Sequence, residues 1–120
     1  MQGSDADGAQ AGQVREATEA DFDAIVDGNH MVVVDAYATW CGPCKVYSPV
    51  FEQVAARHPD VAFVKFDVDA QPAIAQALGI QAMPTTVFFL HGQVAGAVPG
   101  ALRPNQLEDL LGQLKQHHHH

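Results

Sequence analysis

The segment Met31–Tyr37 constrains the fold of this chain more than any other stretch, because it is rich in β-branched residues and its apolar side chains do not alternate with polar ones. A strand with that pattern is covered on both faces rather than on one. The chain has 120 residues, enough for one domain and too few for two. We therefore expect a single sheet in which this strand is central.

The segments around this strand supply the other elements of such a sheet. Apolar spacing, caps and turn residues predict, in order, a short strand near Val14, a helix from Thr18 to Gly28, the strand 31–37, a helix from Cys41 to His58, a strand over 61–68, a helix over 71–78, strands over 85–90 and 93–98, and a helix over 103–115. The last two strands form a hairpin. The predicted fold class is α/β, with a mixed sheet of four to five strands and helices on both faces.

Composition separates the two ends of the chain from its middle. Residues 1–13 carry almost no apolar side chains, so we expect a disordered N-terminal segment there. Residues 117–120 are four histidines, which are typical of a purification tag. The folded domain is therefore expected over residues 14–116.

Net charge and cysteine content limit which classes of partner and which cellular compartment are expected. Fourteen acidic and six basic residues give a net charge of −8, which argues against nucleic acid or an anionic membrane as a partner. No apolar run approaches the roughly 20 residues of a membrane span. A secreted domain stabilised by disulfides usually has four or more cysteines, whereas this chain has two. A reducing compartment, the cytoplasm, is the expected location.

The two cysteines lie in the run Trp40-Cys41-Gly42-Pro43-Cys44-Lys45, at the junction of the central strand and the following helix. Cys41 is then at the helix N-terminus, where unpaired N–H groups and the helix dipole stabilise a thiolate. Cys44 lies one turn later, and we expect it to point inward and to keep its proton. An exposed, activated thiol beside a buried one is the arrangement that thiol–disulfide exchange requires. Trp40 either shields the sulfur atoms or is an ordinary core aromatic.

Two charged residues interrupt strands that are otherwise apolar. Asp35 lies in the run 31–37 and Lys65 in the neighbouring predicted strand. A buried carboxylate is costly unless it is paired, so the pKa of Asp35 should rise. We expect the two side chains to meet beneath the cysteines, where Asp35 would take the proton of Cys44 and Lys65 would tune it. The alternative is that Asp35 faces solvent at a frayed sheet edge.

Other kinds of site have little support. The histidines outside the tag, His30, His58 and His91, fall at turns and at no ligand spacing to Cys41, so we expect no metal and interpret each histidine as solvated. The same placement argues against a Cys–His hydrolase. No phosphate-binding glycine loop or nucleotide fingerprint is present.

The stretch VVVDAYATWCGPCK resembles the active site of the thioredoxin family, and the resemblance extends over about residues 18 to 115. Met83-Pro84-Thr85 is similar to the family's cis-proline segment, Lys65 to its buried lysine, and Gly100-Ala101-Leu102 to its late glycine turn. The resemblance implies a thioredoxin fold. Three places depart from the family pattern and leave substrate choice and redox potential open: Ala36-Tyr37, Tyr47-Ser48 and Gln81-Ala82-Met83.

The resemblance also implies roles for individual residues. Cys41 would be the nucleophile, Cys44 the resolving thiol and Asp35 the proton acceptor, tuned by Lys65. A cis Pro84 would face the sulfurs, and the backbone of Met83 would pair with an extended substrate. The expected substrate-binding residues are Trp40, Gly42, Pro43, Met83, Pro84 and Gly100.

The implied activity is reduction of protein disulfides, within cell redox homeostasis and electron transport. The expected partners are disulfide-containing proteins and a separate electron donor similar to thioredoxin reductase. The chain would work as a monomer and without a cofactor other than its own Cys41–Cys44 disulfide. Two alternatives stay open: a disulfide oxidant or isomerase, and a scaffold that binds a partner without redox turnover.

Overall fold

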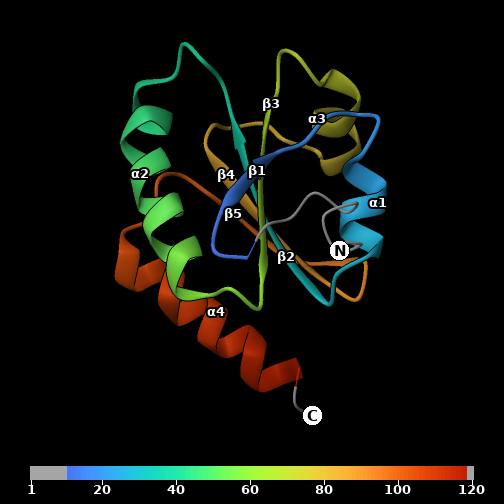
Figure 1. Cartoon of the computed structure of the whole chain (residues 1–120). Coiled ribbons are helices and arrows are strands. Elements are labelled where there is room, and N and C mark those ends of the chain that lie inside the picture. The colour runs from blue at the N-terminus through green and yellow to red at the C-terminus, as the bar shows by residue number, and fades with distance from the viewer. Residues whose placement is uncertain (1–10, 119–120) are drawn as a thin grey trace.

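The computed structural model describes residues 11–118 (Figure 1), so the predictions for residues 1–10 and for the end of the histidine run lie outside the described residues. Within that range the chain forms β1 (Val14–Glu16), α1 (Phe22–Asp27), β2 (Met31–Tyr37), α2 (Gly42–Arg57), β3 (Ala62–Asp67), α3 (Pro72–Leu78), β4 (Thr85–Leu90), β5 (Gln93–Pro99) and α4 (Pro104–His118).

The strands form one mixed sheet in the order β1-β3-β2-β4-β5. β2 lies at its centre, parallel to β3 and antiparallel to β4. β1 is parallel to β3 at one edge, and β5 is antiparallel to β4 at the other. The predicted central strand and the mixed α/β sheet are confirmed.

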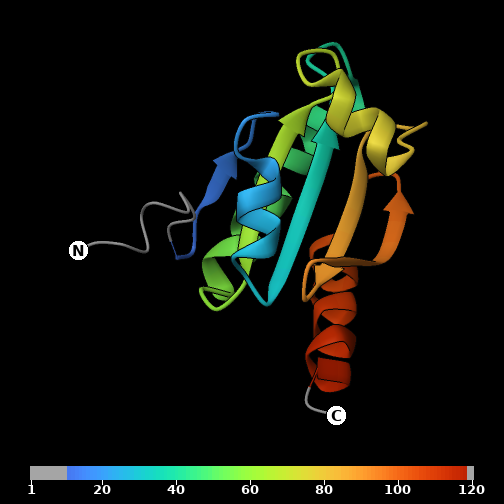
Figure 2. The same ribbon diagram turned by 90° about the vertical axis from the view of Figure 1, so that its right-hand side faces the viewer.

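Helices cover both faces of the sheet, as Figures 1 and 2 show. Val32, Val34 and Ala36 of β2 belong to the core on the side of α1 and α3. Met31 and Val33 belong to the core on the side of α2 and α4. The apolar run of β2 does not alternate because each of its faces meets a hydrophobic layer.

Two helix boundaries differ from the prediction by more than one residue. The first helix begins at Phe22 rather than at Thr18, because the Asp21 carboxylate accepts the backbone N–H of Thr18 at 2.7 Å and an Arg15 guanidinium N–H at 2.6 Å. These bonds hold residues 19–21 as a turn before the helix. The last helix continues from the predicted end at Lys115 to His118, since no helix-breaking residue follows Lys115.

Candidate active site

The two cysteines form a disulfide at the start of α2. Cys41 is the N-cap residue of the helix, and the backbone N–H of Cys44 donates to its Sγ at 3.2 Å. Gly42 and Pro43 form the first turn, where the missing N–H of proline costs no hydrogen bond. The Cys41 sulfur therefore lies where helix N–H groups converge, as the sequence predicts.

The expected contrast in exposure between the cysteines is wrong for this oxidised form. Cys41 is 5% exposed and Cys44 is 4% exposed. The disulfide ties the two sulfurs together, and a small apolar cluster that includes Ala38 and Met83 packs around them. The difference between the thiols that remains is positional: one caps the helix and the other lies inside its first turn.

A second segment reaches the sulfurs from the start of β4. The Met83–Pro84 peptide bond is cis, as the resemblance implies. The carbonyl oxygen of Met83 lies 3.5 Å from Cys41 Sγ. Gly100 has φ +96 and its N–H donates to the carbonyl oxygen of Pro84 at 2.7 Å. The structure thus brings together Cys41, the cis-proline segment and the glycine turn, which are far apart in the sequence.

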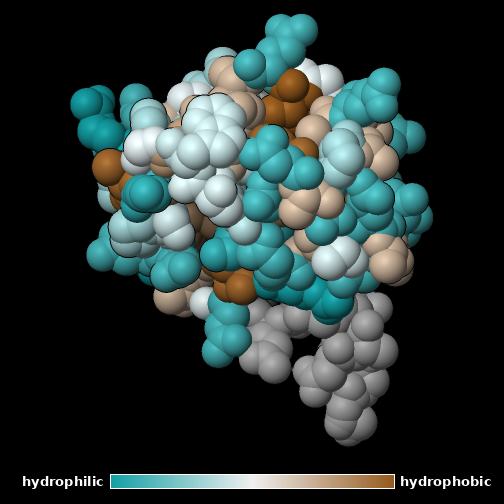
Figure 3. Space-filling view, turned by 90° about the horizontal axis from the view of Figure 1, so that it is seen from above, coloured by the Kyte–Doolittle hydropathy of each residue, from teal (hydrophilic) through white to brown (hydrophobic). Residues whose placement is uncertain are grey.

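Trp40 lies at the surface beside the disulfide. Its side chain is 67% exposed, and its ring N–H donates to Asp69 Oδ2 at 2.8 Å. The alternative that Trp40 is a core aromatic is therefore wrong, whereas its role as a shield for the sulfurs stays a prediction. Figure 3 views the molecule from the end where α2 begins and shows hydrophobic and intermediate side chains among hydrophilic ones.

Asp35 lies beneath the cysteines, and the alternative that it faces solvent is wrong. It is 2% exposed, and its Oδ1 atom has no hydrogen-bond partner among the described residues. A cavity of about 250 Å³ is lined by Asp35, Tyr37, Ala38, Thr39, Cys44, Lys45, Ser48 and Lys65. Burial raises the pKa of Asp35 from its ordinary value of 3.8 to about 7, while Lys65 lowers it and Glu16 raises it. A carboxyl with that pKa can accept or release a proton near neutrality.

Strand register places Lys65 next to Asp35, and both line the same cavity. Asp35 of β2 pairs with Lys65 of β3, and Lys65 in turn pairs with Glu16 of β1. The three side chains therefore share one row and one face of the sheet. The Lys65 ammonium lies 3.9 Å from Glu16 Oε1, and Tyr37 donates its hydroxyl hydrogen to Glu16 Oε2 at 2.6 Å.

Glu16 and Tyr37 were missed by reasoning from the sequence. The available signal was weak: Glu16 is one of several charged residues near the N-terminus, and Tyr37 only marks a departure from the family pattern. Their placement depends on the parallel register of β1 on β3, which the sequence does not reveal.

His58 is not the solvated residue that the sequence predicts. Its side chain is 14% exposed. Its Nε2 atom lies 2.5 Å from Glu108 Oε1, and Lys115 donates to its Nδ1 atom at 2.8 Å. His30 and His91 come together at the other turns, with their Nδ1 atoms 3.4 Å apart. Among the side chains that the structure describes, those of residues 11–116, no group of three or more histidine, cysteine, aspartate or glutamate residues could hold a metal ion.

Comparisons with known proteins agree with this geometry. The family model "Thioredoxin" matches residues 13–113. Putative thioredoxin 2 of Streptomyces coelicolor is 43% identical over 101 residues, which cover 84% of this chain and 75% of that protein. The thioredoxin of Malassezia sympodialis is 47% identical over 94 residues, which cover 77% of this chain and 89% of that one.

Solved structures show the same fold. The long form of spinach chloroplast thioredoxin f superposes with a TM-score of 0.82 at 32% identity, covering 92% of this chain and 93% of that one. Oxidised mitochondrial thioredoxin 3 of Saccharomyces cerevisiae gives a TM-score of 0.78 at 40% identity, covering 83% of this chain and 94% of that one. The predicted thioredoxin fold is confirmed. The chain belongs to the thioredoxin family and, with its redox-active Cys41–Cys44 pair, is a thiol–disulfide oxidoreductase that reduces protein disulfides.

Proposed function

We propose that the reaction begins with attack of the Cys41 thiolate on a substrate disulfide. A bond forms between Cys41 Sγ and one substrate sulfur, and the other substrate sulfur leaves as a thiolate. Cys41 is suited to this step because it caps α2, whose N–H groups stabilise negative charge on its sulfur. The reduced protein must also expose Cys41 more than the oxidised form does.

Cys44 then attacks Cys41 Sγ, which breaks the mixed disulfide and releases the substrate sulfur that was bonded to Cys41 as a thiolate. The Cys41–Cys44 disulfide forms, so two electrons have passed from the dithiol to the substrate. Cys44 must first lose its proton, and Asp35 is the base at hand because both residues line the 250 Å³ cavity. The cavity has room for a water molecule that carries the proton between them. This shared cavity is the observation that carries the proposed mechanism.

The substrate-binding surface consists of Trp40, Gly42, Pro43, Met83, Pro84 and Gly100. The backbone of Met83 would pair with an extended substrate segment next to Cys41. Lys65 would tune Asp35 from the neighbouring strand. A backbone-mediated grip suits many flexible disulfide-containing segments, because it does not depend on the substrate's side chains.

Turnover needs a partner that restores the dithiol. The chain would receive two electrons and two protons from a separate reductase, flavin-dependent by family analogy, and would itself work without a bound cofactor. We place it in the cytoplasm as a monomer. Within the described residues, no helix is both long and apolar enough to cross a membrane.

Three variants test the assigned roles. Cys44→Ser should trap substrates as mixed disulfides on Cys41, whereas Cys41→Ser should reduce no insulin disulfide. Asp35→Asn should form the mixed disulfide at the normal rate but release the product at least 10-fold more slowly near neutral pH, in line with the ~10²–10⁴-fold typical of general-base catalysis. Insulin reduction by Cys41→Ser would contradict the nucleophile assignment, and unaltered release by Asp35→Asn would contradict the base.

A further inference from the structure

The row Glu16–Lys65–Asp35 places one ammonium group between two carboxyl groups. Lys65 stands on β3, with Glu16 opposite it on β1 and Asp35 opposite it on β2. The two carboxyl groups differ in environment: the Glu16 side chain is 48% exposed, whereas Asp35 is 2% exposed. Lys65 can neutralise either one, and its position decides how readily Asp35 ionises.

In this structure the ammonium group is on the Glu16 side. Lys65 Nζ lies 3.9 Å from Glu16 Oε1, and no ion pair within 4.0 Å joins it to Asp35 among the described residues. Tyr37 reinforces the arrangement in two ways. Its hydroxyl donates to Glu16 Oε2 at 2.6 Å, and the centre of its ring lies 5.7 Å from Lys65 Nζ, within the range of a cation–π contact.

We propose that Glu16, held by Tyr37, is a positioning residue that keeps the Lys65 ammonium away from Asp35, so that the Asp35 carboxyl retains the proton affinity needed for proton exchange with Cys44. Glu16 contacts Tyr37 and Lys65 rather than either sulfur. Besides holding Lys65, its own negative charge raises the pKa of Asp35. The inference rests on the proposed role of Asp35, which it deepens by naming what sets the basicity of that group.

Several titratable groups face Asp35 from the surrounding elements. They are Tyr37 on β2, Lys65 on β3, Glu16 on β1, and Cys44, Lys45 and Tyr47 on α2, with Asp67 acting on Tyr37 from β3. The charges that act on the pKa of Asp35 are those of Lys65, which lowers it, and Glu16, which raises it. The Glu16–Lys65 pair is therefore the pair to vary.

The test reads the Asp35 carboxyl directly, by carbon-13 NMR titration of the oxidised protein. In that form Cys41 and Cys44 do not titrate, so the Asp35 curve is not mixed with thiol ionisation. Glu16→Gln should lower the midpoint of Asp35 by on the order of half a unit, because Lys65 becomes free to pair with Asp35. Tyr37→Phe, which keeps the ring but removes the donor to Glu16, should lower it less.

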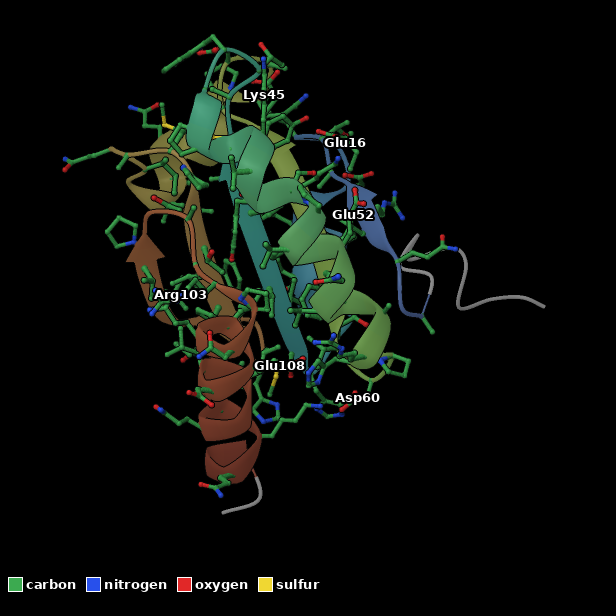
Figure 4. All side chains as sticks on the ribbon, turned by 90° about the vertical axis from the view of Figure 1, so that its left-hand side faces the viewer. Glu16, Lys45, Glu52, Asp60, Arg103 and Glu108 are labelled. Carbon is green, nitrogen blue, oxygen red and sulfur yellow. A yellow bond between two sulfur atoms is a disulfide. The ribbon has the colours of Figure 1, made fainter. Side chains whose placement is uncertain are left out.

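The matched control is Glu52→Gln, which removes the same charge from an exposed residue of the neighbouring helix α2; Figure 4 labels Glu16 and Glu52. It should move the midpoint by much less. In a Lys65→Met background, Glu16→Gln should lose most of its effect, since no ammonium remains to be positioned. A Glu16→Gln shift no larger than that of Glu52→Gln, or one that survives Lys65→Met intact, would overturn the proposal.

The same variants separate this inference from the proposed catalytic cycle. In the reduced protein, Glu16→Gln should move the pH profile of product release toward lower pH by the shift that NMR records. If the NMR midpoint of Asp35 shifts but the pH profile of product release does not shift with it, Glu16 still positions Lys65. The assignment of Asp35 as the base is then wrong.

Discussion

At the scale of single residues, Asp35 and its surroundings determine the proton chemistry. Its carboxyl is buried on the central strand, opens on a cavity shared with Cys44, and has one oxygen without a hydrogen-bond partner among the described residues. Tyr47 is also a buried polar residue, but its polar atom has a hydrogen-bond partner. It is 0% exposed, but its hydroxyl lies 2.7 Å from Thr86 Oγ1, so the buried pair is satisfied.

The sequence predicted the burial of Asp35 because three valines precede it, and it predicted the raised pKa from that burial. It predicted less well where the answer depends on neighbours from distant strands. The polar contacts of His58 and the placement of Glu16 and Tyr37 arise from helix docking and strand register, which no local pattern specifies.

Asp35→Asn should stabilise the protein in alkaline solution. Burial raises the pKa of Asp35 from 3.8 to about 7, so the folded state holds this proton more tightly than the unfolded chain. The resulting contribution to stability is complete below the unfolded pKa and is lost as the pH rises through the folded pKa. Above about pH 8 the variant should gain on the order of 2–4 kcal/mol in free energy of unfolding, and this gain should shrink toward about pH 4.

Urea unfolding at about pH 8.5 and about pH 4.5 measures this difference. Asp109→Asn, at an exposed residue of α4, is the control for a change of net charge. A gain for Asp35→Asn that is equal at both pH values would show that ionisation of Asp35 is not its source.

At the scale of elements, the sequence located the segments that carry the chemistry. The run Met31–Tyr37 is strand β2 with the predicted bounds, and α2 begins directly after Cys41. The first helix starts later than predicted because Asp21, rather than Thr18, is the residue before it. The Asp21 carboxylate accepts the backbone N–H of Thr18 and so holds the turn in front of the helix, and it does not bond to the helix N–H groups. The chemistry lies where β2 ends and α2 begins, so a wrong boundary in α1 does not alter the site.

Helix α4 should matter for stability even though it is far from the disulfide in the sequence. Leu107 is 0% exposed and belongs to the core that α2 also covers. Leu107→Ala leaves a cavity there and should cost about 2–5 kcal/mol in free energy of unfolding. Leu102→Ala, at a half-buried residue of the preceding loop, should cost clearly less. Equal losses in chemical denaturation would contradict the packing of α4 against this core.

The polar contact between α2 and α4 should depend on pH. Glu108 interacts with His58 at the end of α2 and with Arg57, and the hydrogen bond from His58 is the main cause that lowers the pKa of Glu108. A lowered folded pKa gives stability that is present above the unfolded pKa and is lost as the pH falls through the folded value. Glu108→Gln should therefore cost about 1 kcal/mol at neutral pH.

That cost should fade below the acidic range in which Glu108 becomes protonated. Comparing melting curves of Glu108→Gln and Asp109→Asn at neutral and acidic pH distinguishes this contact from a general effect of charge. A cost that persists unchanged in acid would rule out the ion pair as its cause.

At the scale of the whole molecule, two cores sandwich one sheet and leave the disulfide at the end of the central strand. The fold class and the cysteine pair could be predicted from local patterns, because the strand, the helix and the thiols are consecutive in the sequence. The meeting of Cys41 with Met83 and Pro84 could be expected only through family resemblance, since it joins residues from separate elements.

The reduction potential separates a reductase from the oxidant or isomerase alternative. A chain that reduces protein disulfides needs a strongly reducing dithiol, so the Cys41/Cys44 couple should be more reducing than protein disulfide isomerase, whose potential is about −180 mV. Equilibration with glutathione redox buffers measures it. A potential at or above that value would favour the oxidant.

The most direct test of the mechanism is the pH dependence of alkylation in the reduced protein, followed separately at Cys41 and Cys44. Cys41 should react first, with a midpoint below the ordinary thiol pKa of about 8.5, because the N-terminus of α2 stabilises its thiolate. Cys44 should react only at higher pH. A Cys41 that titrates as an ordinary thiol, or a Cys44 that is alkylated before it, would contradict the account.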